Sequence, residues 1–168
     1  MALTDSTMLG WHTGEDEMHD LLKVPEQDNP TSMGLTPFGY FILGKATLLA
    51  VGALDEEGRP WTTLWGGEAG FAQPVGQSVI GLRTVVDEVH DPVLRLLVPS
   101  LGRETDVETE QRKPVAALSI DLATRSRLKI SGEMMAGAVE QKSGQKGSKA
   151  VAEAEAQVII AVKHSLGK

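Results

Sequence analysis

The residue types best suited to chemistry are concentrated in one segment, from Gly58 to Phe71, where aromatic and hydroxyl side chains precede a run of glycines. Side chains on a strand alternate between two faces, so Trp61, Thr63 and Trp65 would share one face. Two indoles around a hydroxyl suit a flat ligand with a polar edge. The same spacing is also typical of tryptophans that fill a core, and spacing alone favours the core.

A second group of candidate residues is the basic run from Thr124 to Gly132. On a strand, Arg125, Arg127 and Lys129 would point to one face at intervals of about 6–7 Å. Three like charges in a row repel one another unless acids, solvent or a bound anion compensate them, and arginine forks match phosphate oxygens. The run therefore predicts either an anion site or a solvated strand face protected by charge.

The histidines give weaker patterns. His12, Glu15 and His19 fall within two helical turns, but their spacing is not the His-Glu-x-x-His of zinc proteases, so we expect no metal site. His90 and Asp91 could act as a base and its orienting acid, yet neighbours in sequence rarely face each other. An aspartate followed by proline is more typical of a helix start. The sequence names no catalytic residue.

The elements that must position these residues begin with a hairpin. The apolar run 47–54 and the segment 60–71 flank a short acidic loop that ends in glycine. Thr36-Pro37 predicts a helix to about Gly44, and Asp91-Pro92 predicts another through about Leu97. A short helix is expected at 15–22, and further strands are expected at 77–83, 114–121 and 124–135. A loop is expected at 98–113 and a flexible linker at 140–148. Within 151–162 the pattern predicts a change from helix to strand.

Many short strands with few helices predict a mainly β protein of the α+β class. We expect a small barrel of about six strands with helices on its outside. Residues 1–35 should form an N-terminal arm with one short helix, and residues 36–168 the barrel domain.

Composition and charge exclude several classes of function. The chain has 168 residues, of which 41% are hydrophobic and 23% charged, as in ordinary globular proteins. No apolar stretch approaches the length of a membrane span, and the start lacks a secretory signal. The absence of cysteine excludes disulfides, thiolate metal sites and cysteine catalysis, and fits a cytoplasmic protein. A net charge of -7 argues against binding to nucleic acids or anionic membranes.

Several short segments occur in an order that is more specific than any one of them. They are Trp11 to Glu15, Asn29-Pro30, 48–52, 55–61, 66–71, Asp121 with 124–127, and 165–167. This order resembles the pyridoxamine 5'-phosphate oxidase-like family of FMN-binding split β-barrels. The resemblance runs from about residue 11 to the last residues of the chain.

The resemblance implies an FMN cofactor in a groove between the two subunits of a homodimer. The second strand of the hairpin would line the flavin, and positive charge near the ring would stabilise its reduced, anionic form. The implied activity is that of an oxidoreductase that passes electrons between a nicotinamide or other reductant and an unknown small acceptor. The cofactor-binding residues implied are Arg59, Trp61, Thr62, Thr63, Leu64, Trp65, Gly66, Gly67, Arg83, Arg125, Arg127 and Lys129.

Departures from the family pattern leave alternatives open. Oxidases of the family have arginine and lysine near the positions of Thr63 and Glu68, and a basic pair after the third strand, where this chain has only Arg83 before acids. Relatives of this subtype continue beyond 165–167, which predicts a C-terminal truncation of the barrel domain. The alternatives are a non-catalytic split-barrel module that has lost flavin, and a haem- or deazaflavin-binding relative.

Overall fold

The computed structural model describes residues 9–98, 112–141 and 154–167. The described residues form a mainly antiparallel β structure with a few helices, which confirms the predicted fold class. The helices are α1 (Thr13–Leu22), α2 (Pro37–Lys45) and α3 (Pro92–Leu97). The strands are β1 (Ser32–Met33), β2 (Leu48–Leu54), β3 (Pro60–Gly66), β4 (Ala72–Gly76), β5 (Val79–Val86), β6 (Pro114–Ile120), β7 (Arg127–Gln141) and β8 (Ala154–Gly167).

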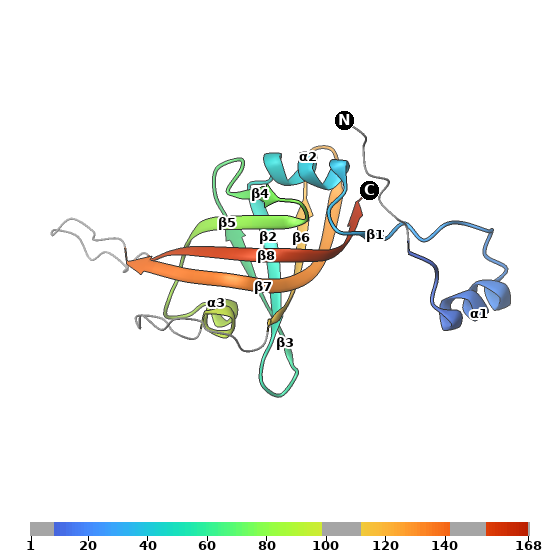
Figure 1. Cartoon of the computed structure of the whole chain (residues 1–168), viewed down its shortest axis with the longest axis horizontal. Helices are drawn as coiled ribbons and strands as arrows, with labels where there is room; N and C mark the ends of the chain where they lie inside the picture. The colour runs from blue at the N-terminus through green and yellow to red at the C-terminus, as the bar shows by residue number, and fades with distance from the viewer. Residues whose placement is uncertain (1–8, 99–111, 142–153, 168) are drawn as a thin grey trace.

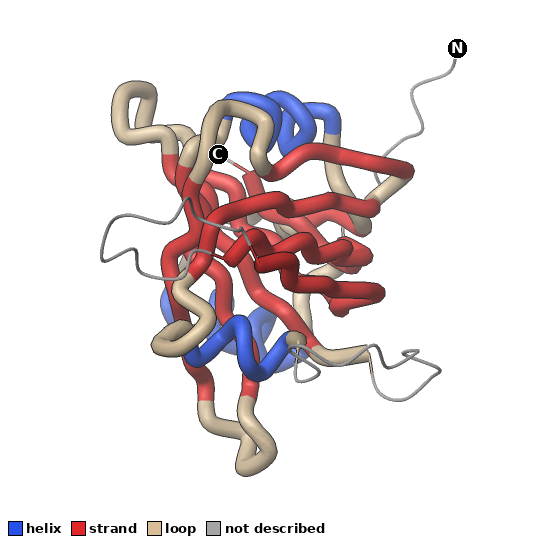
Figure 2. Tube along the Cα trace, turned by 90° about the vertical axis from the view of Figure 1, so that its left-hand side faces the viewer, coloured by secondary structure: helices blue, strands red, loops and turns tan. Residues whose placement is uncertain are grey.

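The strands form one curled sheet in the order β3-β2-β6-β7-β8-β5-β4, with the short β1 paired to β8. The sheet closes on itself where the Thr84 hydroxyl of β5 donates to the Gly66 carbonyl at the end of β3, at 2.6 Å. Because a side chain makes this bond, the seam between β3 and β5 is looser than a strand ladder. The result is a split β-barrel, as predicted, and Figure 2 shows its strands stacked between helical segments above and below.

The barrel core follows from strict alternation along the strands. On β2, Leu49, Val51 and Ala53 are buried, while the residues between them face outward. Trp65 of β3 is 2% exposed. Further interior residues come from β5, β7 and β8, among them Ile80, Leu82, Leu128, Ile130, Ala156, Val158 and Ile160.

Local capping signals explain why the helices begin where they do. The Thr36 side chain accepts the Gly39 N–H at 3.1 Å, and proline takes the first position of α2. Asp91 caps α3 in the same way. Figure 1 shows α2 and α3 at opposite ends of the barrel, so the capping predictions also place the two end covers. None of the described helices is long and apolar enough to cross a membrane.

Four sequence expectations need correction. The helix expected from 151 is wrong for residues 154–156, which lie in β8, because β8 pairs with β5 and β7 on both sides and all three residues are buried. The strand expected from 124 begins at Arg127, since the Asp121 carboxylate accepts the N–H groups of 123 and 124 and holds a turn. The strand count exceeds six because β1 and β4 were not foreseen. Of the linker expected at 140–148, residues 140 and 141 instead end β7, and 142–148 lie outside the described residues, as do 99–111 of the loop expected at 98–113.

Candidate functional site

The side chains on the inward side of β3 form hydrogen bonds with the residue that begins α3. The Trp65 indole N–H donates to Asp91 Oδ2 at 2.7 Å, and the Thr63 hydroxyl donates to the same oxygen at 3.1 Å. The other oxygen of Asp91 accepts the N–H groups of Val93 and Leu94. Trp65 is therefore a core residue, and the Thr63 hydroxyl already has its acceptor in the protein.

The tip of the β2–β3 hairpin uses two further residues of the expected site. The Trp61 indole N–H donates to Asp55 Oδ2 at 3.0 Å, and Arg59 Nε donates to the same oxygen at 2.7 Å. Arg59 also pairs with Glu57. The Trp61 hydrogen bond, followed by those of Arg59, lowers the pKa of Asp55 to about 2. The two indoles thus bind different carboxylates and do not frame a common ligand.

The outward side of β3 belongs to a broad, mostly apolar sheet surface. The strand register places Leu64, Ala50, Leu118 and Lys129 in one row across β3, β2, β6 and β7. We call the β3–β2–β6 part of this surface the outer face. Its residues are Leu48, Ala50, Gly52, Thr62, Leu64, Ala116, Leu118 and Ile120.

A cavity of about 520 Å³ adjoins the outer face, between the N-terminal arm and the β7–β8 pair. We call it the arm pocket. Arg127 and Lys129 both line it, as the alternation of β7 predicts. Arg125 does not, because it lies in the preceding turn with φ 62°. The other lining residues are Trp11, Gln27, Asp28, Pro30, Leu166 and Gly167.

Hydrogen bonds within the arm join its outgoing and returning segments beside this pocket. The Trp11 indole donates to the Gln27 carbonyl at 2.8 Å, and the Asn29 amide donates to the Gly10 carbonyl at 3.2 Å. Trp11 also packs edge-on against His19, with ring centroids 4.8 Å apart. The sequence resemblance included these arm segments but gave them no role in the site. Only the fold shows that they lie against the basic strand.

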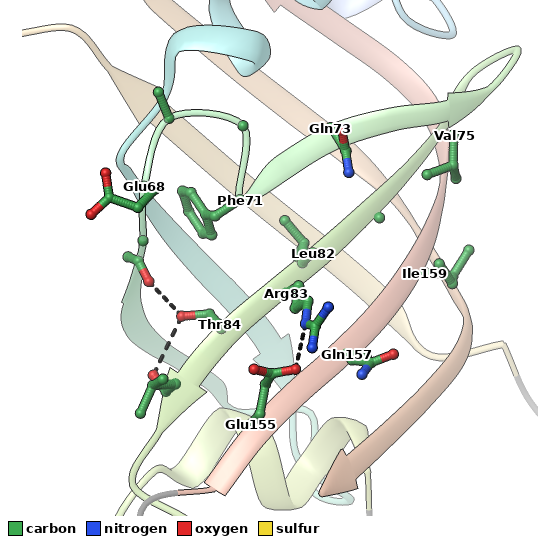
Figure 3. A pocket seen from close by; sticks show the side chains of 16 residues that line it. Glu68, Phe71, Gln73, Val75, Leu82, Arg83, Thr84, Glu155, Gln157 and Ile159 are labelled. Carbon is green, nitrogen blue, oxygen red and sulfur yellow. Dashed lines mark hydrogen bonds and ion pairs between the residues drawn. The ribbon is translucent and has the colours of Figure 1, made fainter. Parts of the chain in front are cut away.

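A second cavity, of about 680 Å³, contains the remaining members of the expected site. Gly66, Gly67 and Arg83 line it together with residues of β4 and β8, and we call it the β5 groove. Figure 3 shows Arg83 against Glu155 of β8, with which it forms an ion pair. Glu155 was not foreseen as a site residue because its segment was expected to be helical. The structure thus divides the expected residues between two cavities, the outer face, the hairpin tip, the contact with Asp91 and the turn before β7.

The histidine patterns have structural explanations. His90 Nδ1 lies 2.9 Å from Asp87 Oδ2, and the hydrogen bonds from His90 lower the pKa of Asp87. Asp91 faces away from this pair, toward β3 and α3. His12 caps α1 by accepting the Gly14 N–H. Among the residues that the structure describes, no three His, Cys, Asp or Glu side chains gather as a metal site.

Comparisons with known proteins give similarity at the level of fold. No protein-family model matches the chain, and no curated protein matches it. HupZ from Group A Streptococcus is 10% identical over 79% of this chain and 93% of its own, with a TM-score of 0.47. An F420 reductase is 11% identical over 77% and 98%, with a TM-score of 0.46.

A putative pyridoxamine 5'-phosphate oxidase from Lactobacillus delbrueckii is 9% identical over 79% of this chain and 93% of its own, with a TM-score of 0.46. The neighbours therefore include proteins of the family that the sequence resembles. The fold assignment itself rests on the strand order, the register and the closing contact between β3 and β5. By that topology the chain is a split β-barrel.

Proposed function

We propose that this chain is an FMN-binding oxidoreductase that holds the cofactor phosphate in the arm pocket. It would pass electrons between a nicotinamide or other reductant and a small acceptor. The observation that carries the proposal is the presence of Arg127 and Lys129 side by side in one cavity with the Trp11 indole. This is the one basic pair of the expected set that shares a described cavity.

The charges of the arm pocket suit a phosphate. Two cations face one carboxylate, that of Asp28, so the lining carries a net positive charge within a chain of net charge -7. Arginine binds phosphate through two parallel N–H groups, and lysine acts as a compact point charge. The cavity volume falls within the usual range for small-molecule sites. The donor set therefore fits the phosphate end of FMN.

The chain's own residues would bind and orient the cofactor. Arg127 and Lys129 would hold the phosphate, while the Trp11 indole offers an aromatic surface at the wall of the same pocket. Bound FMN would supply the hydride or electron transfer. Thr63 and Arg59 contribute less than the resemblance implied, since each already bonds an acid of the protein.

The proposal includes a homodimer. Leu64 is 65% exposed and Leu48 is 47% exposed, and both lie on the outer face beside small residues. A sheet surface of this kind is normally covered by another element. A second copy over the outer face would also shield the arm pocket from solvent, because the two adjoin along β6 and β7.

Titration of the purified protein with FMN tests the proposal, followed by flavin fluorescence and by quenching of tryptophan emission. We expect saturable binding with one flavin per chain. Arg127→Ala should weaken binding on the order of tenfold or more, because it removes charged hydrogen bonds to phosphate. Arg59→Ala removes the same charge at the hairpin tip and should leave the affinity unchanged.

Two outcomes would replace this function with its alternatives. A folded wild-type protein that binds no flavin would be a non-catalytic split-barrel module. Selective affinity for a deazaflavin, or a Soret band on addition of haem, would assign the pocket to that cofactor instead. Equal loss of affinity in Arg127→Ala and Arg59→Ala would place the phosphate outside the arm pocket.

A further inference from the structure

Helix α1 carries an apolar stripe that none of the residues described by the structure covers. Met18, Leu21 and Leu22 are 50%, 76% and 67% exposed, and none of the residues of α1 is buried. Their spacing of three and four residues places them on one side of the helix. The helix is nonetheless well formed at its start, since His12 and Glu15 make a reciprocal capping box.

The chain holds α1 away from its own barrel. The arm leaves and returns at one place, where Leu9 N–H donates to the Thr31 carbonyl, Trp11 to Gln27 and Asn29 to Gly10. Figure 1 shows α1 standing apart from the strands beyond this base. These bonds close the base of the arm, and α1 lies beyond that base. Its apolar stripe is therefore presented outward.

The outer face has the shape and composition to receive such a helix. Ala50, Gly52 and Ala116 are neighbours in the register and form a floor of small residues. Leu64 stands on one side of this floor and Ile120 on the other, both exposed. A helix of ten residues is about 15 Å long, which is comparable to the span of the three strands.

Charge also matches between the two surfaces. Glu17 flanks the apolar stripe of α1, and Asp16 and Asp20 add further negative charge to the helix. Arg125 lies in the β6–β7 turn just beyond Ile120, next to the basic start of β7. An acidic helix on the outer face would therefore meet positive charge at the β6–β7 side and no acid of β2 or β3 in its path.

We propose that α1 of one copy docks on the outer face of a second copy, and that the second copy returns the same contact. Such a reciprocal exchange is a closed two-fold arrangement. The inference rests on the homodimer of the proposed function but does not depend on FMN. It gives the arm two tasks, since its base lines the arm pocket of its own chain and its helix covers the barrel of the partner.

Disulfide trapping tests the docking in flavin-free protein. Because the chain has no cysteine, a Leu21→Cys variant and a Leu64→Cys variant each carry a single thiol. Mixed and mildly oxidised, they should yield a disulfide-linked heterodimer in high yield. Leu21→Cys mixed with Val75→Cys, whose exposed residue lies on β4 at the far end of the strand order, is the matched control.

The outcomes separate this inference from the cofactor proposal. Equal yields with Leu64→Cys and Val75→Cys would show random collision and overturn the docking. A Leu21→Cys/Leu64→Cys double variant that closes a disulfide within one monomer would also overturn it. Leu21→Ser/Leu22→Ser, whose changes lie on an exposed helix surface, should raise the dimer dissociation constant on the order of tenfold or more. FMN binding plays no part in any of these results.

Discussion

A single carboxylate, that of Asp91, joins two elements that are far apart in the sequence. One oxygen caps α3, and the other accepts from the side chains of Thr63 and Trp65 on β3. The cap could be foreseen from the Asp-Pro pair. The bonds from β3 could not, because they depend on how the strand and the helix pack. Thr63 and Trp65, both expected to line a cofactor, join the barrel to its end cover through this carboxylate.

Trp65→Phe should therefore lower the free energy of unfolding, and not only weaken ligand binding. It keeps most of the buried aromatic surface but removes one donor from a largely buried carboxylate, which should cost about 1–3 kcal/mol. Urea denaturation of wild type and variant measures the difference. Trp61→Phe, at the exposed hairpin tip, is the control and should lower the free energy of unfolding less. Equal losses would contradict the role given to Asp91.

The hydrogen bonds at the hairpin tip should be detectable through the pKa of Asp55. The folded pKa of Asp55 is about 2, below its ordinary 3.8, so this group stabilises the fold above pH 3.8 and loses that contribution as pH falls through 2. Trp61→Phe should raise the pKa of Asp55 toward 3.8, as followed by NMR of the carboxyl carbon. Asp121, whose pKa is lowered chiefly by the Thr124 hydroxyl, should titrate unchanged.

At the scale of elements, the long β7–β8 pair depends on a bulge. The register shifts between Ser131 and Gly132, where the backbones of the two strands approach closely. A Cβ added at Gly132 would lie 3.0 Å from the carbonyl carbon of Ala161, whereas one at Gly44 of α2 would meet nothing within 4 Å. Alanine at Gly132 thus tests strand packing, and alanine at Gly44 tests helix propensity, with stability changes of opposite sign expected.

Gly132→Ala should destabilise the protein by about 1–3 kcal/mol, because the backbone of β8 cannot yield as a flexible side chain would. Gly44→Ala should stabilise it by about 0.5–1 kcal/mol through helix propensity. Thermal or urea unfolding measures both changes. A neutral Gly132→Ala would mean that the bulge can shift without loss of pairing.

Elements with local signals could be predicted, and those without could not. The hairpin, α2, α3 and β6 each have a turn, a cap or an alternating pattern in their own residues. Ala154 and Ala156 look helical, but their burial between β5 and β7 decides the strand. Likewise, Arg127 and Lys129 were expected to share a face, while the contribution of Trp11 to the same cavity depends on the path of the arm.

At the scale of the whole molecule, the outer face should control association. Leu64→Asp places a charge at its centre and should shift the proposed dimer toward monomer, measured by sedimentation across a range of concentrations. Val75→Asp makes the same change on β4 and should leave the dimer intact. Because Leu64 is already exposed in the single chain, its replacement should not lower the stability of the monomer.

The pairing of β5 with β8 has a consequence for how the chain reaches its native state. Val79 pairs with Ala161 and Val86 with Ala154. The partner strand of β5 is therefore made of residues that lie much later in the sequence. The entropy lost in closing so long a loop must be overcome before pairing of β5 with β8 stabilises the chain. Refolding after dilution from denaturant should therefore take milliseconds to seconds. Before β8 pairs with them, the unpaired edges of β5 and β7 can pair with other molecules. Aggregation is therefore most favoured at this stage of folding.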